Sequence, residues 1–421
     1  MLKKYANKSL TQRESKQSSP EINSFKALIN KKTAFFFMLL TYKFRIYPSK
    51  QQQEKLLFVL DKCRFTYNKL LEILNKQEKI NQSEIQAEIP KLKEQYPDLN
   101  EIYSKTLQYE SYRLFSNLRA LSRLKKNGKK IGCLRFKGKD WFKTFTYNQS
   151  GFVLEIKNKK YNKLHLSKIG SIPIRTHRVI NGSIKQVQIK KECSGKWFAL
   201  LCVHMNEPKQ REKTKKSIGI DLGTINFIYD SDGNHADHPK FLNKSLKKLA
   251  AEQRKLSRKK KGSNNRTKQK INVAKIHEAI CNQRNDFLHK ISRYYVNNYS
   301  FIAAEDLDIR NIIKESYSAR NIMDASWSNF LQMLKYKAES AGISFVKVNP
   351  RDTTSKCYKC GTIVKKPLSE RIHRCACGLE IDRDYNAALN ILKSGQELAL
   401  EPLELPIKEV MNQEAAAFRL Q

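Results

Sequence analysis

The chain has 421 residues, which is long for one compact core, so we expect two or three domains. Its 81 Lys and Arg residues face 40 Asp and Glu, a formal net charge of +41. A compact chain this unbalanced repels itself unless a polyanion binds, which favours nucleic acid over a membrane surface as partner. No apolar run approaches the roughly 20 residues that span a bilayer, so no membrane partner is expected.

The nine cysteines are distributed unevenly along the chain. Five stand singly and four cluster between Cys357 and Cys377. This distribution favours a metal site plus free thiols in a reducing compartment over a disulfide framework. The apolar stretch Ala34–Leu40 lies behind a long polar segment and lacks a small-residue cleavage site, so we discount export and consider Met38 as an alternative start.

The chain opens with a segment that we expect to be disordered, residues 1–38, because Lys, Ser and Gln dominate it. Residues 42–46 then alternate apolar and basic side chains and precede Pro48, which predicts a strand. Leucines at helical spacing predict one helix from Ser49 and another over about 104–124.

Short apolar runs separated by turn residues follow, and they predict strands at Phe145–Tyr147, Phe152–Ile156, Leu164–Leu166, Val187–Ile189 and Trp197–Val203. The pattern over residues 39–210 is typical of a small β-barrel, with a helical insert of about 50–125 near its start.

A basic link, Glu207–Lys216, separates this region from the next. The pattern beyond it predicts an α/β core: strands Ser217–Asp221, Phe301–Ala304 and Ser344–Val348, a turn at Asp230–Gly233, and helices over about 242–258, 271–298, 326–341 and from Asp384 onward.

Two short cysteine pairs, each followed by glycine, indicate a zinc site: Cys357 and Cys360, then Cys375 and Cys377. Zinc takes four soft ligands in a tetrahedron, and a closed shell of four leaves no open position for water, so the site is predicted to be structural. The second pair has only one residue between its cysteines, and the nearby His373 is therefore an alternative ligand.

Three groups of acids stand at the ends of predicted elements. Asp221 and Glu305 end apolar strands, while Asp382 and Asp384 open the last helix. Strand-end and N-cap acids are common. If the strands are neighbours, however, the carboxylates meet and would need cations, and two magnesium ions there could hydrolyse a phosphodiester.

Two further stretches suggest contacts with nucleic acid. Between Lys247 and Lys275 the chain carries twelve Lys or Arg and one acid, a run that we expect to grip phosphates near the cut site without reading sequence. Aromatic and basic residues interleave over 135–143, where Phe136 or Trp141 could stack on a base; such stretches are also ordinary strand edges.

With these residues in view, the chain resembles the TnpB (OrfB) family of transposon-encoded, RNA-guided DNA endonucleases, which is related to type V CRISPR effectors. The resemblance covers about residues 41–392. It is carried by Tyr42–Ser49 with Cys63–Asn68, by Lys130-Ile-Gly and Arg135-Phe-Lys, by Asn349–Cys357, and by three motifs like those of RuvC nucleases: Gly219–Thr224, Glu305-Asp-Leu and Asp382–Asn390.

The resemblance implies a multidomain α+β fold. A wedge-like β-barrel with a helical recognition insert would come first, followed by an α/β, ribonuclease-H-like RuvC nuclease domain with an inserted zinc ribbon. The expected boundaries are 39–210 for the barrel, 211–350 for the first part of the nuclease, 351–380 for the ribbon, 381–396 for the last nuclease helix and 397–421 for a C-terminal tail.

Carried over residue by residue, the resemblance implies that Asp221, Glu305 and Asp384 are the catalytic acids, with Asp384 preferred over Asp382. It implies that the four cysteines bind structural zinc, and that magnesium serves catalysis. The implied activity is cleavage of double-stranded DNA beside a short target-adjacent motif, directed by a guide RNA from the transposon end. A non-cleaving regulator of the transposon and a strand-joining transposase are the alternatives. The implied location is the cytoplasm of a prokaryotic host, at the nucleoid.

Overall fold

The computed structural model describes residues 39–77, 81–157, 162–205, 214, 216–315, 319–367 and 370–400. The predicted extension at 1–38, nearly all of the basic link and the tail beyond residue 400 lie outside these ranges. No helix within them is long and apolar enough to cross a membrane.

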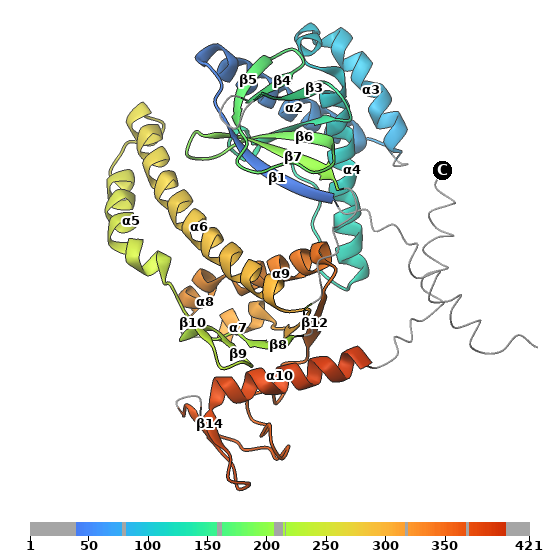
Figure 1. Ribbon diagram of the computed structural model, residues 1–421. Coiled ribbons are helices and arrows are strands. Elements are labelled where there is room, and N and C mark those ends of the chain that lie inside the picture. The colour runs from blue at the N-terminus through green and yellow to red at the C-terminus, as the bar shows by residue number, and fades with distance from the viewer. Residues whose placement is uncertain are drawn as a thin grey trace, which may run out of the picture.

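The first unit is a seven-stranded antiparallel sheet in the order β2-β6-β7-β1-β5-β4-β3. It curls into a half barrel (Figure 1), and among the described strands its ladder stays open between β2 and β3, where the sequence predicted a barrel. The strands are β1 (Leu39–Ile46), β2 (Thr144–Asn148), β3 (Phe152–Ile156), β4 (Asn162–Leu166), β5 (Gly170–Arg175), β6 (Ser183–Lys191) and β7 (Trp197–His204).

Alternation explains why these segments pair. Every second residue of β7 is buried, and the same period of two appears in β4, so one face of the sheet is apolar. Strand β5 was not predicted, because Pro173 interrupts a short segment; its backbone still pairs with β1 and β4.

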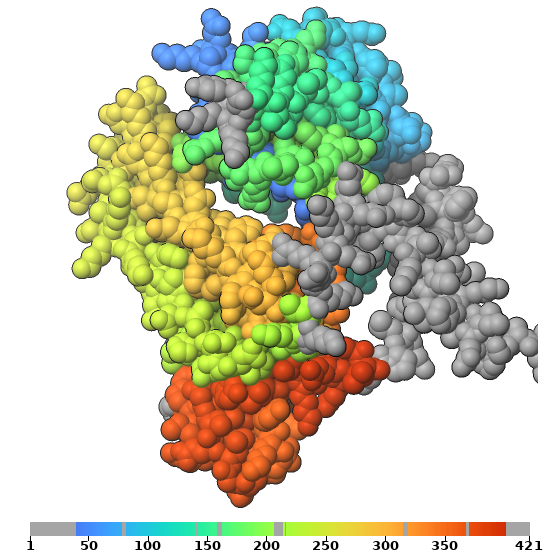
Figure 2. Space-filling view, in the orientation of Figure 1, coloured from blue at the N-terminus to red at the C-terminus, as the bar shows by residue number. Residues whose placement is uncertain are grey.

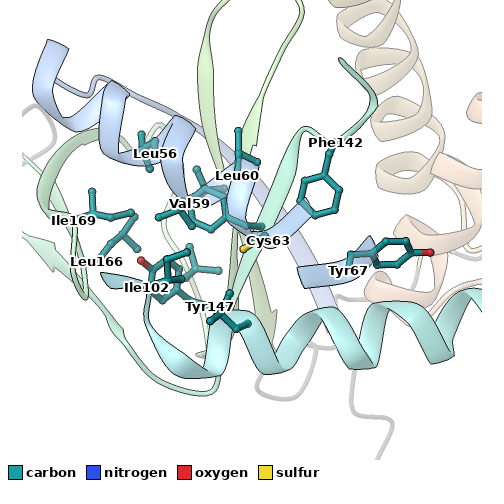
Figure 3. Close-up of a cluster of buried hydrophobic side chains, with 14 of the residues drawn as sticks. Leu56, Val59, Leu60, Cys63, Tyr67, Ile102, Phe142, Tyr147, Leu166 and Ile169 are labelled. Carbon is teal, nitrogen blue, oxygen red and sulfur yellow. The ribbon is translucent and has the colours of Figure 1, made fainter. Parts of the chain in front are cut away.

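Helices fill the connection between β1 and β2, as predicted: α2 (Lys50–Leu74), α3 (Gln82–Gln95), η1 (Pro97–Glu101), α4 (Ser104–Lys126) and η2 (Lys139–Trp141). Ser49 and Gln52 form a capping box that begins α2. The apolar side of α2, including Leu56 and Cys63, packs with Tyr147 and Leu166 of the sheet (Figure 3), so helices and half barrel share one core.

The second unit is a five-stranded sheet in the order β10-β9-β8-β11-β12. Strands β8, β11 and β12 are parallel, whereas β9 and β10 run antiparallel. The strands are β8 (Ser217–Asp221), β9 (Asn226–Asp230), β10 (His235–Asp237), β11 (Phe301–Glu305) and β12 (Ser344–Val348), and a separate hairpin is made of β13 (Ile372–Arg374) and β14 (Glu380–Asp382).

The helices of this unit are α5 (Phe241–Ser257), α6 (Asn264–Asn298), α7 (Ile309–Glu315), α8 (Ala319–Ala325), α9 (Trp327–Ala341) and α10 (Arg383–Leu400). The α/β core is therefore confirmed, with differences at its edges. Helix α6 begins seven residues earlier than predicted, where Ser263 caps a polar first turn, and the short helices α7 and α8 were not predicted. Helix α10 extends past residue 396 into the segment predicted as tail.

Helices cover both faces of this sheet (Figure 1). Ile302 and Ala304 pack with α6 and α9, whereas Ala303 packs with Ile391 of α10. Because side chains alternate along a strand, odd-numbered residues of β8 and β11 face α10.

The two units meet beside α6. Lys196, in the turn between β6 and β7, forms an ion pair of 3.1 Å with Glu278 of α6. A cavity of about 1610 Å³ lies between β1 on one side and α6 and α9 on the other. In Figure 2 the surface is hollowed between the green strands and the gold α6.

Candidate active site and metal centre

Two of the predicted catalytic acids end neighbouring parallel strands. Asp221 is the last residue of β8 and Glu305 the last of β11. Ile220 pairs with Ala304, so the next residue on each strand, Asp221 and Glu305, lies at the same edge of the sheet. Both residues are odd-numbered and lie on the face that α10 covers.

The third acid, Asp384, lies in the first turn of α10, and close packing brings this helix onto the sheet. Gly219 has no room for a side chain, because a Cβ there would lie 2.2 Å from the carbonyl oxygen of Ala388. Gly395 of α10 is equally tight, since a Cβ there would lie 2.5 Å from Cβ of Ala303. A glycine on each side lets the helix backbone approach the strands and carry Asp384 toward the other acids.

The electrostatics agree that the three carboxylates are neighbours. Burial raises the pKa of Asp221 well above its usual range, and the charges of Glu305 and Asp384 raise it further. Burial likewise raises the pKa of Glu305, although a hydrogen bond from the Thr353 hydroxyl opposes this. Like charges held together without water favour either protonation or a bound cation.

Asp382 and Asp384 have different surroundings. The carboxylate of Asp382 accepts hydrogen bonds from the backbone amides of Asp384 (2.8 Å) and Tyr385 (3.1 Å), so it caps α10. Asp384 is buried and contacts two guanidinium groups, those of Arg371 at 3.5 Å and Arg383 at 3.4 Å. The capping role of Asp382 supports the preference for Asp384 as the catalytic acid.

The four cysteines converge. Their sulfur atoms all lie within 4.8 Å of one another, with Cys357 and Cys377 3.7 Å apart and Cys360 and Cys375 3.5 Å apart. Zinc–sulfur bonds of about 2.3 Å at tetrahedral angles require sulfurs about 3.8 Å apart, so the group could hold a zinc ion. The hydroxyl and amide of Thr362 lower the pKa of Cys360 to about 6, which favours a thiolate there, whereas burial and hydrogen bonds shared with the other cysteines raise the pKa of Cys375 to about 11.

Each cysteine pair sits on a tight turn that closes on glycine. Gly361 donates its amide to the carbonyl of Cys357, and Gly378 donates to Cys375, both with positive φ angles near 80°. His373, the alternative ligand, is buried on β13 and is not part of the sulfur group, so the structure favours four cysteines.

The cysteine region is docked directly on α10. The side chain of Asn386 accepts from the amide of Tyr358 and donates to the carbonyl of Lys356, and Asn390 donates to the carbonyls of Thr353 and Lys356. The helix that carries Asp384 is therefore fixed by the segment that could hold zinc.

The basic run divides into two parts in the structure. Arg266 turns inward and donates to the carbonyls of Leu256 and Lys259, closing the turn between α5 and α6. Most of the other cations of the run are exposed. Figure 1 shows that these two helices extend away from the sheet, so the densest part of the run stands apart from the three acids rather than beside them.

Sequence reasoning missed the residues that surround the acids. Thr353 belongs to the Asn349–Cys357 motif, and a hydroxyl side chain within that motif is the sequence feature by which it could have been found. Arg383 is the sequence neighbour of Asp384, whereas Arg371 reaches Asp384 only through the fold of the β13–β14 hairpin, and nothing in its spacing indicates the contact.

Comparisons with known proteins match most of the chain. A family model described as "Probable transposase" (OrfB of IS605) matches residues 200–315, and one described as "Cas12f1-like, TNB domain" matches 327–391. A third, described as "Helix-turn-helix domain", matches 38–82, where the described residues form β1 and the single long helix α2.

Two relatives align over most of both chains. A Streptomyces pristinaespiralis protein named "Putative RNA-guided DNA endonuclease" is 32% identical over 84% of this chain and 89% of its own length. The InsQ protein of Escherichia coli K12, with the same designation, is 29% identical over 85% and 92%. A solved structure titled as the mini-RNA-guided endonuclease Cas-phi3 covers 90% of this chain and 97% of its own, with 9% identity and a TM-score of 0.46.

The family model and the two relatives define a class of nucleic-acid-processing proteins related to transposases. Within that class, the chain belongs to the TnpB (OrfB) family.

Proposed function

We propose that the chain is an RNA-guided, magnesium-dependent DNA endonuclease with a ribonuclease-H-like RuvC domain and an inserted zinc ribbon. The observation that carries the proposal is the convergence of Asp221, Glu305 and Asp384 from two parallel strands and one helix. The names of the relatives support the same activity.

The donor set fits magnesium. Carboxylate oxygens are the hard ligands that Mg²⁺ prefers, and a cation would compensate both the burial and the neighbouring carboxylates that raise the pKa of Asp221. Bound there, two ions would activate a water molecule and stabilise the leaving oxygen of a phosphodiester. The chain's own part is to hold the ligands: Thr353 donates to Glu305, and the packing of α10 on Gly219 positions Asp384.

The proposed binding partners follow from the net charge of the chain and from the family to which it belongs. A net charge of +41 supports binding of long polyanions, here a guide RNA from the transposon end and double-stranded target DNA. Base pairing with the guide would select the target, while the protein would recognise a short adjacent motif and the duplex backbone.

The assignment is tested by two substitutions that remove the same charge two residues apart. Asp384→Asn should slow plasmid cleavage at least about a hundredfold, because several kcal/mol of transition-state stabilisation depend on the ligand. Asp382→Asn should cleave normally, since asparagine caps helices as well as aspartate does. Both proteins are assayed with magnesium and the RNA that copurifies with them.

The two alternatives predict other outcomes. A non-cleaving regulator would bind the same RNA and DNA while the unsubstituted chain left every plasmid intact in magnesium. A strand-joining transposase would produce joined products instead of free ends. Equal cleavage by the Asp384→Asn and unsubstituted proteins would refute the assignment of the acids.

A further inference from the structure

Residues 135–143, here called the strap, form the last part of the connection from α4 to β2 and display an aromatic ring to solvent. The side chain of Trp141 is 85% exposed, whereas the other two tryptophans, Trp197 and Trp327, are only 2% and 4% exposed. Phe136 of the strap is also exposed. A single exposed hydrophobic residue is ordinary, so its surroundings decide what it means.

The strap is held firmly against the helices. Asn68 of α2 bonds both backbone groups of Lys137, accepting from its amide at 2.7 Å and donating to its carbonyl at 3.1 Å. Phe142 points into the core (Figure 3), and the guanidinium of Arg113 lies over its ring at 4.7 Å. With its neighbour anchored inward, Trp141 is presented outward by a fixed backbone, so binding on it would require little ordering of the strap.

A groove of about 790 Å³ runs beside the strap, between α2, the β6–β7 turn and α6. Leu57, Phe58 and Ile271 give it an apolar part. Trp141 lies between two residues that line it, Lys139 and Phe142. Trp141 itself does not line the groove, but the chain joins its exposed indole to the groove through Lys139 and Phe142, so one strand of nucleic acid could reach both.

The described residues that line the groove include more cations than acids. Its two acids are already engaged, Asp61 with Arg64 at 2.9 Å and Glu192 with Lys43 at 2.8 Å. Four lysines also line it, and none of them forms a salt bridge within the described part of the chain: Lys139, Lys143, Lys191 and Lys270.

We infer that this groove binds an unpaired nucleic-acid segment, with a base stacked on Trp141 and the adjoining phosphates held by the four lysines. Stacking needs a base whose face is free, so a continuous duplex does not satisfy the site, whereas a single strand supplies both ring and charge. The inference rests on the proposed function, because it requires that nucleic acid be the partner. It adds a place of contact apart from the three acids.

The tryptophan content of the chain provides a direct test. Because Trp197 and Trp327 are buried, quenching of the intrinsic fluorescence by iodide reports chiefly on Trp141. Binding of oligouridylate, oligothymidylate or the copurified guide RNA should quench this emission and protect it from iodide, in a buffer without magnesium or chelator so that no cleavage occurs and zinc is retained. Quenching by the guide RNA alone identifies the RNA as the source of the base; quenching that appears only after target DNA is added identifies the DNA.

Substitutions separate stacking from folding. Trp141→Ala should weaken binding of the single strand about 5- to 100-fold, as expected for loss of one stacked base, while Trp141→Phe should retain most of it. Ile156→Ala removes a comparably exposed hydrophobic side chain from β3 and should change nothing. Lys143→Glu should also weaken binding of the single strand, because it replaces one of the cations proposed to hold the phosphates with an anion.

The outcomes distinguish the inference from the function on which it rests. Nucleic acid that binds and is cleaved while Trp141 stays unquenched and accessible to iodide would overturn the inference alone. Failure of the unsubstituted chain to bind any nucleic acid would overturn both. Loss of affinity in Trp141→Ala that Trp141→Phe does not restore would also contradict stacking.

Discussion

Because α10 packs closely on the sheet, we predict that the single methyl group added by Gly219→Ala sharply reduces the rate of cleavage. In Gly219→Ala the new Cβ would lie 2.2 Å from the carbonyl oxygen of Ala388 and 2.6 Å from the amide nitrogen of Leu392. Both are backbone atoms, so relief requires α10 to move away by roughly 1 Å to restore ordinary contact. A misplacement of about 1 Å in an active site can cost about a hundredfold in rate. We therefore expect cleavage about a hundredfold slower.

The assay is single-turnover plasmid cleavage with magnesium and saturating guide RNA, so that binding and release do not obscure the chemical step. Gly132→Ala is the matched control, because a Cβ there has no neighbour within 4 Å. Circular dichroism and the bound zinc content would show whether the variant is folded. A folded Gly219→Ala protein that cleaves at the normal rate would refute the proposed link between the packing of α10 and the position of Asp384.

Two further predictions concern the buried acid of α4 and the cysteine site. Burial raises the pKa of Glu110 from 4.5 to about 8, against the opposing charge of Arg113. The stability that this group contributes is therefore full below about pH 4.5 and is lost as pH rises from there through 8, a change of up to about 5 kcal/mol. Glu110→Gln should abolish this dependence of stability on pH. Hydrogen exchange in α4 of the variant should therefore slow relative to the unsubstituted chain as pH rises from 5 to 9. A difference between the two proteins that does not change with pH would contradict the prediction. Removal of zinc by a chelator, followed by return of magnesium, should reduce cleavage and loosen the first turn of α10. Asn386→Ala should reproduce part of the effect with zinc retained, whereas full activity of the zinc-free chain in magnesium would show that the cysteine site does not support the acids.

Local sequence signals predicted the elements that carry the acids. Asp221 and Glu305 end short apolar strands that are buried on both faces, and such runs are recognisable from composition alone. Helix α3 was missed because Pro90 and its polar neighbours hide a weak apolar stripe, although Asn81 caps it. Short helices such as α7 and α8 have too few residues to show a period.

The side-chain environment of the acids was beyond sequence reasoning because it depends on which surfaces meet. The family resemblance preferred Asp384 over Asp382, but the residue pattern alone does not show what either side chain contacts. Only the hydrogen bonds of Asp382 to the helix amides distinguish a cap from a buried carboxylate. Gly219 belongs to a motif that the sequence shows. The α10 backbone approaches so closely that only glycine fits there, but this is a tertiary contact that the sequence does not show.

The cysteine site and the acids form one mechanical unit, which explains why a structural metal would be placed beside a catalytic one. Asp384 lies in the first turn of a helix, where fraying is easiest and where a ligand must nevertheless be fixed. The β13–β14 hairpin, which carries the second cysteine pair in its turn, ends at Asp382, whose carboxylate caps the first turn of α10. One turn further on, Asn386 binds the backbone on both sides of Cys357. A closed zinc shell would thus hold both flanks of the turn that carries Asp384, and it would do so without contributing a ligand to the reaction itself.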